Sequence, residues 1–415
     1  MESRHAATRP GARGASPLAL VLGLATLATA SITGVALRRH TIRSGARADW
    51  HAAFAEARAR EAGLASQLGD RPVLWGEARA ERAQPHYERA LAEVRGWNHD
   101  WVLDSARSRP AERTALIRAG SRALEELYLG AHATDASWKH DWSLGFDLPQ
   151  QKLGDMRKLS VLVQVKSDSL VTSGDDTRAV EVLLDFLQLA GDLTQSRHAN
   201  NAALSAHLLC PDALLARVED GSIRSWSQDA LKKLRKGLVE LDRRMTWQLP
   251  SLDYYAVTHA HGLKGFLDLE RLEGPEADQM WGELDIAARW SQSVQYLREL
   301  TRLTDDLKGQ VELGPDSAFA EIARFSEQRQ ALVDRNQVAS TCMTLLDTLH
   351  RARFHSIGRF RMLVHALAPT NPPKDPWLAT LLREETTESG RRLWLEYDAD
   401  GFGANFLDAQ ILVAR

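Results

Sequence analysis

The sequence predicts an all-α protein: an irregular α-solenoid or helical bundle behind one N-terminal transmembrane helix, with a small C-terminal β-hairpin. Apolar residues recur at three- and four-residue spacing through most of the chain, as they do on the buried face of a helix. An uncharged segment, Pro17–Leu37, precedes these stretches. Patterns typical of strands are almost absent before residue 390. These three observations set the expected order of segments.

The uncharged segment reads PLALVLGLATLATASITGVAL. At 1.5 Å per residue, a helix of this length crosses a bilayer core of about 30 Å. Residues 1–16 form a basic tail before it. No later segment reaches the length of uncharged apolar sequence that a second span needs. We therefore expect residues 17–37 to be the part of the chain that contacts the lipid bilayer.

A cleaved signal peptide is the alternative interpretation of this segment. Pro17–Leu27 would then be the apolar core, and Ala28-Thr29-Ala30 matches the small-residue pattern of a cleavage site. The apolar run, however, continues to Leu37 and stops only at Arg38. This length favours an uncleaved anchor over an exported, soluble body.

The orientation of the anchor is less constrained, because arginines on its two sides nearly balance. Those before it are Arg4, Arg9 and Arg13, and those after it are Arg38, Arg39, Arg43 and Arg47. A short tail before a first hydrophobic segment usually stays inside. We therefore expect a single-pass protein of the cell inner membrane, with the body on the non-cytoplasmic side.

Composition narrows the class of the remaining chain. A hydrophobic content of 44% with 26% charged residues is ordinary for a globular protein. Residues 1–47 hold seven Arg against one Glu, which leaves residues 48–415 with 45 basic and 54 acidic residues. An acidic body argues against a nucleic-acid partner. Two distant cysteines, Cys210 and Cys342, exclude a disulfide framework and a zinc ribbon. They either stay as buried thiols or form a single pair.

Residues 38–70 are predicted to be a helical stalk. The stretch Ala48–Leu68 is rich in alanine and in alternating Glu and Arg, with a thin apolar stripe. Such a pattern is typical of an exposed helix, which we expect to rise from the membrane. Gly69-Asp70-Arg71-Pro72 ends it.

Residues 71–368 are predicted to be the α-helical body. Residues 175–194 carry apolar side chains on two faces, which predicts a central helix. Ser225 and Gln228 form a capping-box pattern before a heptad series of apolar residues, whose basic neighbours we expect to be solvated. Further helices are expected at 111–131, 148–170, 199–218, 252–272, 280–311, 316–335 and 337–368.

Residues 369–415 are predicted to be a Pro-rich segment and the C-terminal hairpin. Four prolines between residues 369 and 376 end helix formation. A short helix is expected at Trp377–Glu385. Arg391–Asp398 and Ala409–Ala414 alternate or run β-branched around Asp400-Gly401, which predicts a hairpin.

The pattern W-x-H-D-W occurs twice, at Trp97–Trp101 and at Trp138–Trp142. The 41-residue separation suits a two-helix repeat. Two His-Asp pairs supply imidazole and carboxylate ligands for a divalent metal, as in helical metal-dependent phosphohydrolases. The candidate ligands are His99, Asp100, His140 and Asp141. The structural alternative, in which tryptophans wedge helix corners while His and Asp cap turns, is the preferred interpretation.

Two weaker patterns predict no site. His259 and His261 are two residues apart and point to different faces of a helix, so a shared metal would need a local break. The segment from Glu396 to Gly401 resembles the start of a calcium loop, but Leu407 stands where a bidentate glutamate belongs. G-x-S-x-G, P-loop and G-x-G-x-x-G motifs are absent from the sequence.

Several short passages are similar to those of a protein family: RPVLWGE at 71–77, WKHDW at 138–142, Gly174-Asp175, DPW at 375–377, Gly390 and LWL at 393–395. The chain thereby resembles an uncharacterised family of bacterial proteins with one N-terminal transmembrane helix and a long α-helical body. The resemblance implies architecture and topology. The family has no established activity, so it implies no catalytic residue.

Two functions follow as hypotheses. The first is a non-catalytic, membrane-tethered scaffold or protein-interaction module that binds another envelope protein, which the anchor, the helical periodicity and the surplus of tryptophan favour. The second is a metal-dependent hydrolase that uses His99, Asp100, His140 and Asp141. The sequence assigns no catalytic residue, no cofactor and no substrate.

Overall fold

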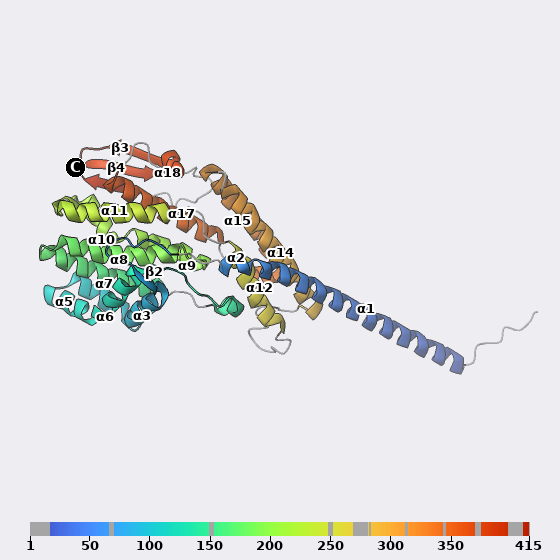
Figure 1. Cartoon of the computed structure of the whole chain (residues 1–415). Helices are drawn as coiled ribbons and strands as arrows, with labels where there is room; N and C mark the ends of the chain where they lie inside the picture. Colours follow the sequence, from blue (N-terminus) through green and yellow to red (C-terminus); the bar gives the residue numbers. More distant parts are fainter. Residues whose placement is uncertain are drawn as a thin grey trace, which may run out of the picture.

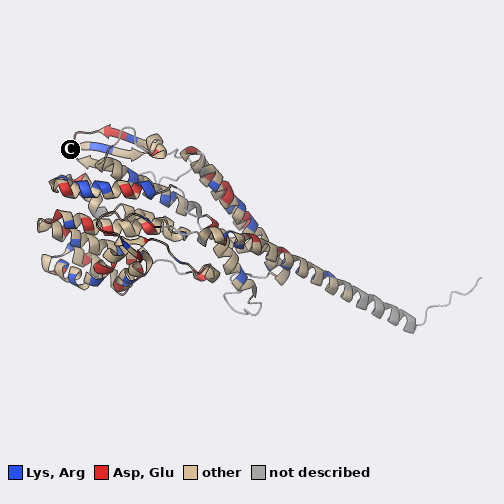
Figure 2. Ribbon diagram, viewed as in Figure 1, with Lys and Arg blue, Asp and Glu red and all other residues tan. Residues whose placement is uncertain are grey.

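The computed structural model is mostly helical, with two small sheets (Figure 1). It describes residues 17–65, 70–148, 153–247, 252–268, 281, 284–311, 314–342, 346–369, 375–396 and 410–414, and of residues 17–32 only the helical backbone. The prediction of an all-α body with a small antiparallel sheet near the C-terminus is therefore confirmed. Acidic and basic residues are interspersed over the ribbons of this body (Figure 2).

Helix α1 (Pro17–Ala59) is a continuous rod that projects from the body (Figure 1). Its first half contains the predicted transmembrane segment, Pro17–Leu37, most of whose side chains lie outside the described residues. Within the part of the chain that the structure describes, we find no helix with the length and apolar character needed to cross a membrane. The transmembrane part of the fold prediction thus lacks support from the structure.

The second half of α1 is not the exposed stalk that the sequence predicts. Trp50, Ala53 and Ala57 are buried, and they lie against α14 (Ile286–Val311) and α12 (Asp253–Asp268). The small alanine side chains let these helices approach closely, while Trp50 fills the interface. A short helix, α2 (Glu61–Ala65), follows and also contacts α12. The sequence did not predict this burial because the buried face of α1 consists mainly of alanine, whose hydrophobicity is low.

The body is a stack of helices whose neighbours are mostly close in the sequence (Figure 1). Contacts run from α3 to α6, from α6 to α8, and from α8 through α11 to α17. Its first part comprises α3 (Ala83–Arg95), α4 (His99–Arg107), α5 (Pro110–Ala119), α6 (Ser121–His132), η1 (Trp142–Asp147), α7 (Leu153–Thr172) and α8 (Asp176–Thr194). The next part comprises α9 (Ala199–Ser205), η2 (Ala206–Leu209), α10 (Asp212–Glu219), η3 (Ser222–Ser225) and α11 (Gln228–Arg244).

Helix α8 occupies the centre of this stack, as its two apolar faces predict. It packs against α7, α6, α9 and α11, and the residues from Leu183 to Thr194 are all buried. Helix α11 buries its heptad leucines, but its N-cap is Ser227, whose hydroxyl accepts from the backbone N–H of Ala230 at 3.3 Å. The predicted capping box at Ser225 is therefore wrong by two residues, because Ser225 ends η3.

The remaining helices are α15 (Pro315–Arg335), α16 (Gln337–Cys342), α17 (Leu346–Leu367) and α18 (Pro376–Leu381). Two strands, β1 (Arg79–Arg82) and β2 (Ala133–Asp135), pair in parallel within the helical body. The sequence does not predict them, since segments of three and four residues are too short to show alternation.

The C-terminal sheet has three antiparallel strands in the order β3-β4-β5, rather than the two of the predicted hairpin. They are β3 (Leu382–Thr386), β4 (Gly390–Leu395) and β5 (Gln410–Ala414). The helix expected at Trp377–Glu385 ends instead at Leu381, and the chain continues directly as β3. Charged residues in β3 lie on an exposed edge, where alternating apolar residues are not required. The predicted turn at Asp400-Gly401 lies outside the described residues.

Candidate binding groove and buried polar clusters

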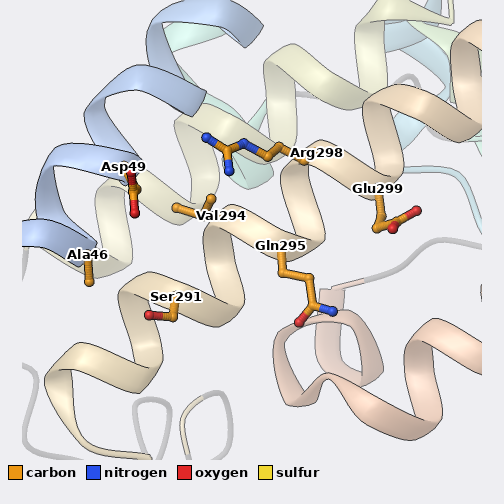
Figure 3. A pocket seen from close by; sticks show the side chains of 7 residues that line it. All are labelled: Ala46, Asp49, Ser291, Val294, Gln295, Arg298 and Glu299. Carbon is orange, nitrogen blue, oxygen red and sulfur yellow. The ribbon is translucent and has the colours of Figure 1, made fainter. Parts of the chain in front are cut away.

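A groove lies between α1 and α14 (Figure 3). Its volume is about 330 Å³. Two residues of α1 and five of α14 line it: Ala46, Asp49, Ser291, Val294, Gln295, Arg298 and Glu299. Ala46 and Val294 are buried and form an apolar floor, whereas the polar residues form the walls.

The groove exists because α1 and α14 run side by side in the same direction. Trp50 lies against Trp290 with ring centroids 5.9 Å apart. Further along both helices, Arg60 donates to both oxygens of Asp305 at 2.7 Å and to Asp253 of α12 at 2.9 Å. Beside the tryptophan contact, the small side chain of Ala46 leaves the space that becomes the groove.

The polar walls carry charges of both signs. Arg298 extends toward α1, on which Asp49 lies, whereas Glu299 points away from α1 (Figure 3). Glu299 forms ion pairs with Arg302 at 3.0 Å and with Arg335 at 3.7 Å. The lining includes no histidine, cysteine or lysine, which are common catalytic bases and nucleophiles. The chemistry of this groove therefore suits binding of a polar, charged segment.

The first W-x-H-D-W box lies at the start of α4. Asn98 caps this helix, and its side chain accepts from the backbone N–H groups of Asp100 and Trp101 at 2.8 and 3.1 Å. His99 and Asp100 are exposed. Trp97 and Trp101 make an edge-to-face contact with ring centroids 5.5 Å apart. This box therefore has the geometry of a capped helix corner.

The second box precedes η1 and has a different environment. Asp141 caps η1 by accepting from the backbone N–H of Ser143 at 3.1 Å. His140 lies beside Trp142 and beside His198, whose ring centroid is 5.5 Å away. Burial lowers the pKa of His140 to about 4 and that of His198 to about 3, so both imidazoles are neutral at pH 7.

The structure does not bring the two His-Asp pairs together. His99 and Asp100 belong to α4, which packs on α5 and α7, whereas η1 packs on α12. Among the described residues, no group of three or more His, Cys, Asp and Glu side chains is placed to hold a metal ion. Of the four candidate ligands, Asp141 has a defined role, as the cap of η1.

The two other histidines that the sequence pairs, His259 and His261, separate onto different faces as expected. His259 is buried and forms a 2.5 Å hydrogen bond with the Tyr296 hydroxyl, while burial lowers its pKa to about 4. His261 Nε2 lies 3.3 Å from Glu61 of α2. Most of the calcium-like segment after Glu396 lies beyond the described residues.

A buried ionic cluster around Arg71 and Asp192 is a feature that the sequence reasoning missed. Arg71 donates to Asp192 through Nε at 3.0 Å and Nη2 at 2.7 Å, and also to the carbonyls of Gly130 and Ala131. The Tyr87 hydroxyl donates to the same carboxylate at 2.9 Å. Arg71 and Asp192 are each less than a tenth exposed. The cluster therefore ties the chain after α2 to α8, α6 and α3.

A second buried pair lies about two turns from Asp192 on the same helix, α8. Trp75 Nε1 donates to Asp185 at 2.8 Å, and His132 Nε2 makes an electrostatic contact with the same oxygen at 3.5 Å. His132 Nδ1 donates to the Glu77 carbonyl at 3.0 Å, because a carbonyl can only accept. Burial raises the pKa of Asp185 to about 6.

A sequence signal for both clusters exists in retrospect. Asp185, Gln188 and Asp192 recur at three- and four-residue spacing within the most buried helix, so three polar side chains share one face that packing should make apolar. Buried polar groups need partners, which points to cations elsewhere in the chain. The identity of those partners, Arg71 and His132, required the tertiary structure.

Two thiols and one arginine are also buried or half-buried in the described part of the body. Cys210 and Cys342 are free thiols, and burial raises the pKa of Cys342 to about 12. Arg353 is fully buried and donates to the carbonyls of Thr194, Ala202 and Thr246. Thr194 is the last residue of α8, and Thr246 follows the end of α11 by two residues. Arg353 therefore stabilises the C-terminal ends of both helices.

Comparisons of the chain with family models, with curated proteins and with solved structures find no match.

Proposed function

We propose that this chain is a single-pass, membrane-tethered α-helical protein whose body is a non-catalytic scaffold that binds another protein of the envelope. The observation that carries the proposal is α1, one helix that contains the uncharged segment Pro17–Leu37 and ends inside the packed body. A helix without a break holds the body at a set distance from the end of that segment. Layered contacts from α3 to α17 support an irregular α-solenoid over a closed bundle.

The groove between α1 and α14 is the surface we propose for the protein partner. Ala46 lies nine residues after Leu37, so the groove begins about 14 Å beyond the end of the uncharged segment at 1.5 Å per residue. A partner in the same membrane reaches this height with a short polar segment. Arg298 and Asp49 offer it charges of opposite sign, and polar rims of this kind are typical of non-obligate interfaces.

Alkaline extraction of membranes tests the tether. We expect the full chain to stay in the pellet, and a Leu22→Arg/Leu27→Arg variant to be released, since each central arginine costs a transmembrane helix about 3 kcal/mol. The matched control is Leu22→Ile/Leu27→Ile, which keeps the segment apolar. Release of the intact wild-type chain would refute the tether. A C-terminal alkaline phosphatase fusion, active only outside the cytoplasm, tests the proposed side of the body.

Site-specific photocrosslinking in intact cells tests the binding surface. A photoreactive amino acid at Ser291 or Gln295 should give a discrete crosslinked species, because both side chains line the groove. The matched control position is Lys236 on α11, which is also exposed but lies in a different layer of the body. Identical products from groove and control positions, or none from the groove, would contradict the proposed interface.

A further inference from the structure

The exposed part of α1 between the uncharged segment and the body carries a set of arginines with no protein partner. These are Arg38, Arg39, Arg43 and Arg47, which we call the basic collar. All four are exposed, and within the described chain none of them forms a hydrogen bond or an ion pair. No acidic residue occurs between positions 17 and 48, so the helix itself offers no counter-charge.

The continuous helix places the collar at a defined height. With 1.5 Å per residue, Arg38 and Arg39 lie within about 3 Å of the end of the uncharged segment, Arg43 lies about 9 Å from it and Arg47 about 15 Å. The headgroup layer on each side of a bilayer core is roughly 5–8 Å thick. Helical side chains lean toward the N-terminus, and here that direction is toward the membrane. In a bilayer spanned by residues 17–37, the first three arginines would be at the height of the lipid phosphates, and Arg47 would lie within reach of their electrostatic field.

Two arginines of the collar lie on the same side of α1 as the face that packs against α14. Arg39 precedes Ala57 by eighteen residues, or about five turns, so it lies on the side of α1 that packs against α14 further along. Arg43 lies within about 40° of that line. Helix α14 begins only at Ile286, beside the tryptophan contact of Trp50 and Trp290. Among the described residues, Arg39 and Arg43 on this side of α1 are exposed.

We infer that the basic collar binds the phosphates of an anionic phospholipid surface and so holds the acidic body close to the membrane. The inference rests on the proposed tether. Guanidinium groups pair with phosphates through two parallel hydrogen bonds, and clustered arginines next to a membrane segment recognise anionic lipids. The body itself is acidic, so such a surface would repel it without the collar.

Spin-labelled lipids test the inference with the full chain reconstituted in phosphatidylcholine vesicles. We expect a motion-restricted lipid population that prefers labelled phosphatidylglycerol over labelled phosphatidylcholine by at least about threefold at low salt. In a chain whose tail arginines Arg4, Arg9 and Arg13 are replaced by glutamine, changing all four collar arginines to glutamine should abolish this preference, while changing them to lysine should keep most of it. Arg58→Gln, at an exposed arginine of α1 beyond the groove, should leave it intact.

The outcomes separate the inference from the tether on which it rests. A motion-restricted population without any preference for phosphatidylglycerol would overturn the collar and leave the tether standing. A preference that survives in the glutamine variant would also overturn the collar. If wild-type vesicles contain no motion-restricted lipid at all, the tether fails, and the collar fails with it. Loss of the preference at high salt, where charges are screened within a few ångströms, is the expected signature.

Discussion

Acidification should unfold this protein sharply, because four of its histidines are held neutral by burial. Their pKa values lie well below the ordinary value of 6.5: about 4 for His140 and His259, and about 3 for His198 and His350. His350 is fully buried, and neither of its ring nitrogens has a hydrogen-bond partner among the described residues. Protonation would place a charge in a buried site beside the guanidinium of Arg353, which disfavours it.

The sign and size of the effect follow from linkage. A lowered folded-state pKa contributes stability that is present above pH 6.5 and is lost as the pH falls toward the folded value. At pH 5 each of the four histidines has lost about 2 kcal/mol, or about 8 kcal/mol together. Asp185 acts in the opposite direction, since its raised pKa of about 6 makes its protonated form favourable, but it returns only about 1.4 kcal/mol at pH 5. The net loss is comparable to the whole stability of a typical domain.

Urea unfolding of the full chain in detergent, followed by circular dichroism between pH 5 and 6.5, measures this effect. The free energy of unfolding should fall by about 3.5 kcal/mol per pH unit over this range, which corresponds to an average uptake of about 2.5 protons once the opposite effect of Asp185 is included. His350→Leu removes one titrating group and should reduce the uptake by one proton, while at pH 7 it is neutral or stabilising, because an unpartnered polar ring leaves the core. An uptake of one proton or fewer in the wild type would refute the assignment of buried neutral histidines.

Two further predictions test the packing directly. Arg71→Met and Asp192→Asn should each lower the free energy of unfolding by about 3–5 kcal/mol, because each substitution leaves the other buried charge without its partner. A double-mutant cycle should show a coupling energy of about 2 kcal/mol between the two residues. Additive effects of the two substitutions would contradict the ion pair. Gly145→Ala should loosen η1 more than Gly262→Ala does, as measured by hydrogen exchange. Gly145 has a φ of 54° and its added Cβ would meet the backbone of Gly262, whereas a Cβ on Gly262 meets only the movable ring of Phe146. Equal exchange in the two variants would sink this reasoning.

The sequence predicts those parts of the fold in which one helix carries its own signal. Helix α8 is central because apolar residues cover two of its faces, and α11 is amphipathic because its leucines follow a heptad. The burial of the second half of α1 could not be predicted in this way. Its buried face is mainly alanine, whose low hydrophobicity resembles that of an exposed helix, and its burial depends on α14, more than 200 residues later in the chain.

The candidate sites were less predictable, because the residues that form them are distant in sequence. The two His-Asp pairs share a motif, yet one lies at the exposed start of α4 and the other beside the buried His198. The groove combines Asp49 with Arg298, two ordinary surface residues that no pattern marks. A motif fixes local geometry, such as the cap that Asp141 provides, but convergence of side chains depends on packing.

The junction at Arg60 explains why the projecting half of α1 and the body should move as one unit. Its guanidinium joins α1 to Asp305 of α14 and Asp253 of α12, and Lys308 reaches the same Asp253 at 2.7 Å. These charges are partly buried, so solvent screens them less than a surface pair. The Arg60 ion pairs and the Trp50–Trp290 contact hold α1 against α14 at two separated points. Two such points prevent α1 from pivoting about either contact. A force or a tilt applied to the projecting half of α1 is therefore transmitted to α12 and α14 instead of being absorbed by a flexible linker.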